Sequence, residues 1–247
     1  MKTRITIPLI AGLLALMQPL TAAAQAEWLV APYVWLSDVS LDQSSGVSGG
    51  ISASDLLDKS DTAGMIRIES AINRWGLTFD YVWLGVSAGT TIPLPPPAGS
   101  LGLNAELDIS IVELGGFFRP SGSDTGIDYL FGVRNVNSDK TLIAIPRIGP
   151  PQRFDGDETF TDVFAGARYR AHFGNEWDFN LRGDYSFGDS EGTWNLLSTV
   201  GYRFNQTFAM NLGYRHLAIE FEDTDNGAVE TTEIELSGPI LGFLFSF

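Results

Sequence analysis

Residues 240–247 read ILGFLFSF and end the chain. Successive side chains of a β-strand point to opposite faces, so Leu241, Phe243, Phe245 and Phe247 share one wholly apolar face. A soluble protein would bury such a face in its core, whereas a membrane barrel would turn it to lipid. The rest of the sequence has to discriminate between these two architectures.

The first 26 residues have the pattern of a secretory signal peptide. Lys2 and Arg4 precede a short apolar stretch over residues 7–16, and Ala24-Gln25-Ala26 matches a small-x-small cleavage site. The apolar stretch is short for a membrane-spanning helix, although a retained anchor is the alternative. We predict export through the Sec pathway, a signal peptide over 1–26 and one domain over 27–247.

The composition narrows the class of protein and of partner. The formal net charge is −15, which disfavours a nucleic-acid partner because phosphate contacts need clustered Lys and Arg. The chain has no cysteine, so it has no disulfide framework. About 220 mature residues suit a single all-β domain. We expect no cofactor and no resident metal.

Period-2 alternation punctuated by turn residues runs through the mature chain and predicts ten strands. These are expected near 28–42, 64–73, 75–90, 103–118, 126–143, 159–173, 177–188, 194–204, 207–221 and 230–247. The connections alternate between short turns and long stretches at 43–63, 91–102 and 144–158. Membrane barrels have short periplasmic turns, longer extracellular loops and an even number of strands. The sequence therefore favours a closed antiparallel transmembrane barrel of ten strands, or eight if one weak hairpin is a loop. The main rival is a soluble periplasmic barrel or sandwich.

The apolar face of these strands is long and aromatic, and tryptophans lie toward strand ends. Trp75 and Trp83 share a face eight residues apart. At about 3.3 Å per residue and a tilt near 40°, they are separated by roughly 20 Å along the membrane normal. Trp177 and Trp194 begin later strands, so we predict that these four residues belong to two aromatic girdles. Trp35 has the opposite parity to Trp28, so one of the two must face inward unless Pro32 marks a bulge.

The signal peptide, the alternating strands and a final strand closing on Phe243-x-Phe245-x-Phe247 resemble small outer-membrane β-barrels of the OmpA and OmpW type. The resemblance implies a place in the Gram-negative outer membrane, with lipids and lipopolysaccharide as neighbours. It also implies that Phe243, Phe245 and Phe247 form the signal read by the barrel-assembly machinery. No motif names a subfamily. An extracellular partner would bind through the long loops, especially 43–63 and 144–158.

The inferred inner face carries a repeated Gly-x-Arg unit and many charges. Each glycine would free space beside its arginine in a narrow interior. The unit occurs at 132–134, 166–168, 201–203 and 213–215. The predicted lumen network comprises Arg67, Glu69, Asp80, Glu106, Asp108, Asp128, Arg134, Asp162, Arg168, Arg182, Asp184, Arg203 and Arg215. Two interpretations remain open: a salt-bridged plug in a barrel with a structural or surface role, or a narrow pore or solute site.

In the strand near 103–118, consecutive apolar residues at Ile111 and Val112 predict a β-bulge.

Catalysis and metal binding have little support in the sequence. Barrels that act on outer-leaflet lipids resemble one another in pairing a histidine with a serine and an acidic residue. Here His172 is expected beside a periplasmic turn, and His216 is expected on the outer face, where Ser198 or Ser237 would help only in a favourable register. The acidic stretch 220–235 has partial EF-hand spacing but reads better as a hairpin tip. We therefore predict a protein that is not an enzyme, with a lipid-modifying enzyme as the least favoured alternative.

Overall fold

The computed structural model describes residues 26–44, 48–51, 60–93, 99–147, 149–225 and 228–247. The strands in these ranges are β1 (Glu27–Trp35), β2 (Asp38–Gln43), β3 (Ser48–Ile51), β4 (Ser60–Ile72), β5 (Trp75–Pro93), β6 (Ser100–Phe118), β7 (Gly126–Pro146), β8 (Gln152–Phe173), β9 (Trp177–Gly188), β10 (Gly192–Arg203), β11 (Phe208–Asp225) and β12 (Ala228–Ser246). Among the described residues, no helix is both long enough and apolar enough to cross a membrane. The expected signal peptide lies outside the described ranges, apart from its last residue.

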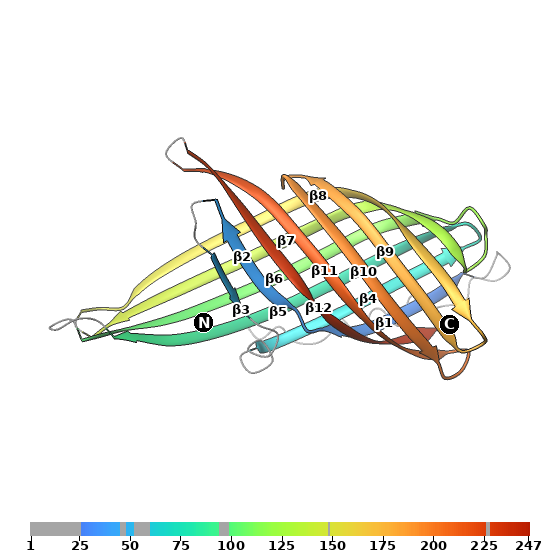
Figure 1. Ribbon diagram of the computed structural model, residues 1–247, viewed down its shortest axis with the longest axis horizontal. Helices are drawn as coiled ribbons and strands as arrows, with labels where there is room; N and C mark the ends of the chain where they lie inside the picture. The colour runs from blue at the N-terminus through green and yellow to red at the C-terminus, as the bar shows by residue number, and fades with distance from the viewer. Residues whose placement is uncertain (1–25, 45–47, 52–59, 94–98, 148, 226–227) are drawn as a thin grey trace.

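The strands close into an antiparallel barrel (Figure 1). From β4 to β12 each strand pairs with the next, and β1 pairs with β4 on one side and with β12 on the other. The strand is interrupted at Leu36 and Ser37, and β2 resumes the pairing with β12 from Asp38. Because β1 and β2 occupy one position in the wall and β3 adds only a short hairpin, the barrel has ten strands. The prediction of ten strands is confirmed, and the eight-stranded alternative is wrong.

Short turns and the C-terminus lie at one end of the barrel. Two residues, Asn73 and Arg74, separate β4 from β5, and three separate β8 from β9. Asn73 and Gly174 hold positive φ angles of 57° and 66°, which asparagine and glycine adopt most readily. Glu27 begins β1 at the same end, where Phe247 exchanges backbone hydrogen bonds with Trp28. In membrane barrels this is the periplasmic end.

Strands β5 to β8 run far past their neighbours at the opposite end (Figure 1). Pairing between β8 and β9 stops at Asp162, although β8 starts ten residues earlier at Gln152. We call residues 85–93, 100–108, 139–146 and 152–157 the extracellular extension. The outer part of this four-stranded sheet was expected to be loop at 91–102 and 144–158. Those segments instead pair in register almost to the tips, from Pro93 with Ser100 on one hairpin to Ala144 with Gln152 on the other.

Apolar side chains face outward over the barrel wall, as the alternation predicts. The outer face of β12 exposes Leu241, Phe243, Phe245 and Phe247. A periplasmic aromatic belt includes Trp75, which lies 4.7 Å from Phe118 between ring centroids, and Trp177, which lies 5.0 Å from Tyr202. Trp194 is 45% exposed and stacks at 4.3 Å on His216 toward the other end, and Trp83 shares the outer face. Trp35 is buried in the interior and Trp28 faces outward, which confirms the prediction that one of these two residues faces inward.

The β-bulge predicted at Ile111 and Val112 does not exist. The pairing of β6 with both β5 and β7 is continuous through these residues. The inner face of β6 consists of odd-numbered residues, including the buried Ile109, Ile111 and Glu113. The strand looked irregular because its inner face changes from apolar to charged along its length, not because the register shifts.

Candidate functional site

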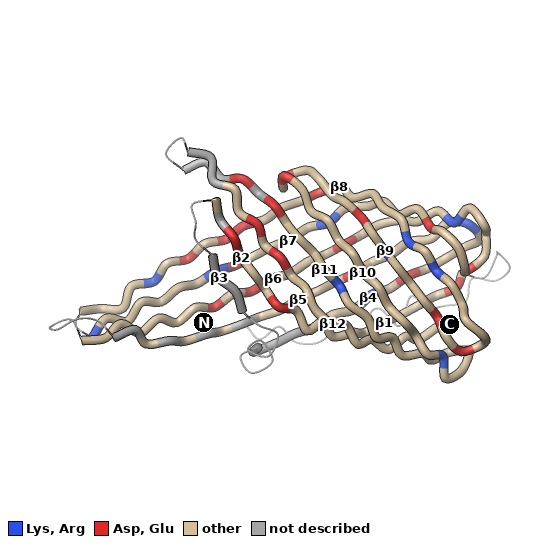
Figure 2. The backbone as a smooth tube through the Cα atoms, viewed as in Figure 1, with Lys and Arg blue, Asp and Glu red and all other residues tan. Residues whose placement is uncertain are grey.

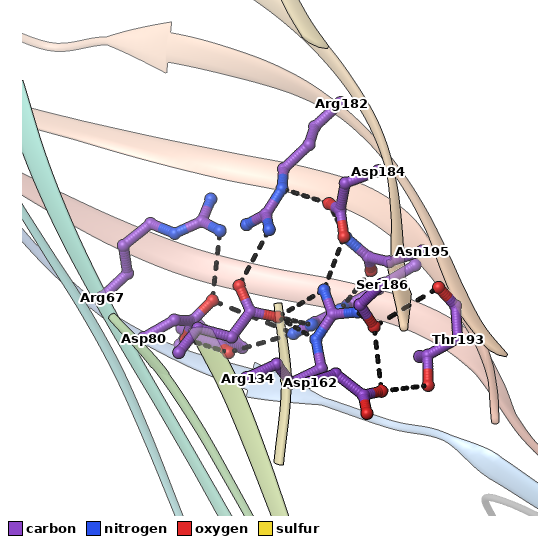
Figure 3. A network of polar contacts seen from close by, with 12 residues as sticks. Arg67, Asp80, Arg134, Asp162, Arg182, Asp184, Ser186, Thr193 and Asn195 are labelled. Carbon is purple, nitrogen blue, oxygen red and sulfur yellow. Dashed lines mark hydrogen bonds and ion pairs between the residues drawn. The ribbon is translucent and has the colours of Figure 1, made fainter. Parts of the chain in front are cut away.

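A network of buried charges crosses the barrel interior (Figure 3). Part of the network is a row of five side chains at paired positions of the neighbouring strands β4 to β8. These are Arg67, Asp80, Glu113, Arg134 and Asp162. Further side chains reach across from β1, β9, β10 and β11. These are Tyr33, Arg182, Asp184, Ser186, Asn195 and Arg215. The network therefore ties together strands from all sides of the bore.

Glu113 is the centre of this network. Its two carboxylate oxygens contact three guanidinium groups: Arg134 at 2.9 Å, Arg182 at 2.8 Å and Arg215 at 3.2 Å. Its exposed fraction is 2%, so these contacts replace the water that the carboxylate loses. Asp184 completes the arrangement by bridging Arg134 and Arg182 at 2.6 Å each. The predicted lumen network did not include Glu113, because its three arginine partners lie on strands far from it in the chain.

Asp80 links the opposite side of the barrel to the same centre. It pairs with Arg67 at 3.1 Å and accepts a hydrogen bond of 2.7 Å from the Tyr33 hydroxyl. Arg215 lies 3.9 Å from Asp80 while it also contacts Glu113. A single arginine thus joins the two acidic residues across the lumen.

A second cluster lies nearer the periplasm around Asp128. Three arginines surround this carboxylate: Arg119 at 3.2 Å, Arg168 at 2.9 Å and Arg170 at 3.3 Å. Arg168 also donates to Glu69 at 2.5 Å. Three cations therefore face two carboxylates, which leaves this cluster with a net positive charge.

Aromatic rings of the inner face contact several of these arginines. Their π faces attract the guanidinium groups and so offset part of the repulsion between neighbouring arginines. Arg134 and Arg182 both lie 5.5 Å from the centroid of Phe164, and Arg168 lies 4.9 Å from that of Phe117. Arg215 stands 4.8 Å from Trp35. Each distance is within the range of a cation–π contact. The inner face therefore uses aromatic residues too, although the alternation assigns most aromatics to lipid.

The Gly-x-Arg glycines share the inner face with their arginines and leave the space that these need. A Cβ atom on Gly132 would lie 2.6 Å from the backbone of Gly115 and 2.8 Å from the Phe164 ring. A Cβ on Gly166 would lie 2.7 Å from the backbone of Asp184. Both approaches are closer than real Cβ contacts, so the packing of neighbouring strands here requires glycine.

Asp162 is held differently from the other buried acids. It accepts hydrogen bonds from hydroxyl groups of Ser190 at 2.5 Å and Ser186 at 3.2 Å, and from the Ser190 backbone at 3.0 Å. Thr193 adds a longer contact of 3.4 Å. Asp162 therefore fastens the connection between β9 and β10 to the wall of the barrel.

Most of an apolar cluster lies on the extracellular side of the charged layer, and its members Leu197 and Ile240 also line a periplasmic cavity. Its members come from most strands of the barrel and are nearly inaccessible to solvent. They are Trp35, Val39, Met65, Val82, Leu84, Ile109, Ile111, Val136, Leu197, Leu217, Ile219, Ile234, Leu236 and Ile240. Leu107 of the extension and Phe160 of β8 pack on it. The interior therefore contains a charged layer and an apolar cluster beside it.

A cavity of about 680 Å³ occupies the periplasmic part of the lumen. We call it the vestibule. Its mouth is lined by the turn residues Asp124 and Gln206 and by Phe247. Its inner end is lined by Tyr33 and Arg215, which belong to the charged layer. The vestibule is thus a recess that opens toward the periplasm and ends at the network.

Two acids predicted in the lumen are not there. Glu106 and Asp108 are exposed and have the opposite parity to the inner residues of β6. That prediction is wrong, because it assumed a register shift that the strand does not have. The other predicted members all have inward parity. Arg203 is the most exposed of these, and it pairs with Asp178 at 2.9 Å beside the periplasmic mouth.

Neither histidine forms a catalytic arrangement in the structure. His172 lies at the periplasmic mouth, between Asp124 at 2.8 Å and Asp178. His216 lies on the outer face directly opposite Ser237. Its Nε2 atom is buried without a hydrogen-bond partner, so it is not paired with that serine. Within the described ranges, no group of three or more His, Asp or Glu residues is arranged to hold a metal ion.

Comparisons with known proteins support the fold. No family model matches the chain, and no curated protein matches it in sequence. Among solved structures, the outer membrane protease OmpT from Escherichia coli aligns with a TM-score of 0.53 at 8% identity, over 93% of this chain and 99% of that one. Ail, the attachment invasion locus protein of Yersinia pestis, aligns at 0.39 and 9% identity, over 91% and 100%. Neisserial surface protein A aligns at 0.29 and 15% identity, over 90% and 99%. At these identities the match to OmpT speaks for architecture alone, and the chain has the fold of an outer-membrane β-barrel.

Proposed function

We propose that this chain is an integral protein of the Gram-negative outer membrane with a sealed lumen, and that it has a structural or surface role. The observation that carries this proposal is the layered interior. Glu113 joins three arginines across the bore, and the apolar cluster around Ile111 and Leu217 lies directly beyond it. An ion crossing the barrel would have to break the first layer and then enter the second, which offers it no hydrogen bonds.

The extracellular surface supports a role outside the lumen. The extension presents a folded sheet well beyond the other strands, and acidic residues predominate on the extracellular parts of β2, β11 and β12 (Figure 2). A folded, acidic surface of this kind suits contact with a cationic extracellular partner, or with lipopolysaccharide phosphates through bridging divalent cations. Phe243, Phe245 and Phe247 on the outer face of β12 suit recognition by the barrel-assembly machinery.

A non-enzymatic role agrees with the histidine positions. The sequence has two histidines, one at the periplasmic mouth and one stacked on Trp194 at the lipid-facing surface. Neither lies inside the extracellular mouth, so a histidine is not available there as a general base. A narrow pore is the second candidate, because the vestibule already opens part of the lumen to the periplasm.

Conductance across a planar bilayer tests the sealed barrel. We expect wild-type protein to show no large, steady channel, because both interior layers stay closed. Neutralising Arg134 and Arg168 together by substitution with glutamine should destabilise the fold and raise the leak, since their carboxylate partners lose compensation. Insertion of each sample is verified by heat-modifiable migration on a gel.

The alternatives give different conductance traces. A wide and stable wild-type conductance that the double substitution only retunes would overturn the sealed barrel and favour the pore. Silence in both proteins would support sealing and assign the barrier to the apolar cluster rather than to the arginines.

A further inference from the structure

The vestibule has two chemically different walls. Its apolar wall comes from the neighbouring strands β11, β12 and β1, which contribute Ala209, Ile240, Leu244 and Ala31. Its charged wall comes from β4, β8 and β9 and includes arginines with their acidic partners. A cavity that joins a broad apolar surface to a few polar groups is typical of sites for small organic molecules.

The charged wall turns its cations toward the cavity. In the pair of Arg67 with Asp80, the arginine side chain is 14% exposed and the aspartate 4%. In the pair of Arg170 with Asp128, the corresponding values are 22% and 1%. In these two pairs the carboxylate is more deeply buried than the guanidinium group, so Arg67 and Arg170 present positive charge to a solute at these two points of the wall.

Arg170 is the least compensated of these cations. It lies 3.3 Å from Asp128, but that carboxylate already accepts hydrogen bonds from Arg119 and Arg168. The Nε and Nη2 atoms of Arg170 are buried and form no hydrogen bond, and the contact of Nη2 with Asp128 is an ion pair only. A partly exposed guanidinium that lines a cavity and shares its carboxylate with two other arginines is suited to a carboxylate or another oxyanion.

We infer that the vestibule binds a small organic anion with an apolar body, which enters from the periplasm. The anionic group would pair with Arg170, and the body would lie against Ala209, Ile240 and Leu244. The volume of about 680 Å³ lies within the range of cavities that hold such molecules. Because the charged layer closes the inner end, the ligand would be retained rather than passed through.

The test is a binding titration with a probe that has this chemistry. Full-length mature protein in lipid nanodiscs is titrated with 4-phenylbutyrate, and binding is followed by saturation-transfer NMR of the probe. The neutral 4-phenylbutanamide serves as the matched probe without charge. We expect saturable binding of the carboxylate and at least about tenfold weaker binding of the amide, because the amide cannot form a charge-assisted pair.

Variants separate the vestibule from the surrounding lipid. Arg170→Gln should weaken carboxylate binding about tenfold with little loss of stability, because Asp128 keeps Arg119 and Arg168. Ala209→Phe should abolish binding of both probes by filling the cavity, and Ala31→Phe replaces it if that variant does not fold. Arg153→Gln, an exposed arginine of the extension, should leave binding unchanged.

The outcomes that overturn the inference are equally specific. Equal binding of the carboxylate and the amide would show that the charged wall is not used. Carboxylate binding that survives both Arg170→Gln and a cavity-filling substitution would place the probe in the bilayer or on another surface. Either result would leave the sealed barrel of the proposed function intact, because that function is judged by conductance.

Discussion

Glu106 and Glu113 lie seven residues apart on β6 and have opposite environments. Glu106 is exposed on the extracellular extension, whereas Glu113 is 2% exposed and contacts three arginines inside the barrel. The same four strands, β5 to β8, build both regions with continuous register. The difference comes from closure, because only the ring of ten strands encloses a lumen that removes water from charges.

The largest effect should come from removing the acid at the centre of the network. Glu113→Gln leaves Arg134, Arg182 and Arg215 without their shared carboxylate, so we expect a loss of about 3–5 kcal/mol in the free energy of unfolding. Urea unfolding in detergent, followed by tryptophan fluorescence, measures it. The matched Glu106→Gln on the extension should change stability by less than about 0.5 kcal/mol. Equal effects at the two positions would contradict the enclosure argument.

Aromatic residues offer a second contrast. Replacing Phe245 and Phe247 by serine should strongly reduce the fraction of folded barrel, because this face contacts lipid and is the expected assembly signal. The heat-modifiable band in membrane fractions measures that fraction. Phe154→Ser, at an equally exposed position of the extension, should leave assembly near wild type. Insertion of both variants at equal rates and levels would show that the terminal strand is not a signal.

Glycines on β8 sharpen the contrast further. Gly166→Val forces a side chain against the backbone of Asp184, and overpacking of this kind costs about 1–3 kcal/mol. Gly156 lies on the same strand within the extension, and a Cβ there meets nothing within 4 Å. Gly156→Val should therefore be tolerated. The midpoints of urea unfolding for the two variants give the comparison, and a larger shift for Gly156→Val would refute it.

The smallest effect concerns two acids outside the membrane. Partial burial raises the pKa of Asp124, but the hydrogen bond with His172, the charges of His172 and Arg170 and a backbone hydrogen bond together outweigh this and hold the pKa below its ordinary value of 3.8. A depressed folded-state pKa stabilises the protein above pH 3.8, and the contribution is lost as the pH falls below 3.8 through the folded value. The stability difference between wild type and Asp124→Asn should therefore shrink below pH 3.8.

Asp155 is the counterpart on the extension. Hydrogen bonds from Thr141 and then Arg153 lower its pKa, yet the carboxyl group is fully exposed. Because solvent screens such contacts, Asp155→Asn should shift the unfolding midpoint less than Asp124→Asn does at neutral pH. A larger shift for Asp155→Asn would mean that the extension contributes more to global stability than its open structure implies.

The sequence predicted the barrel far better than the site. Strict alternation and short turns are local signals, so the ten strands and the outward face of Phe243 to Phe247 could be read directly. Cross-strand register is not local, which is why the contacts of Glu113 could not be seen and why two apolar neighbours were taken for a bulge. The outer part of the extension was missed because Gly, Pro and Ser near its tips suggested loops, whereas pairing between neighbouring strands continues almost to those tips.

The contacts inside the lumen also bear on how the barrel assembles. Glu69 and Arg168 are 99 residues apart in the chain, Glu113 and Arg215 are 102, and Tyr33 and Arg215 are 182. Such pairs form only after distant hairpins meet, so the guanidinium groups remain hydrated until the wall is nearly complete. A slip of one residue at the seam between β1 and β12 would turn Tyr33 outward and Val34 inward. The buried charges therefore favour one register at closure, and they penalise every other ring that the same hairpins could form.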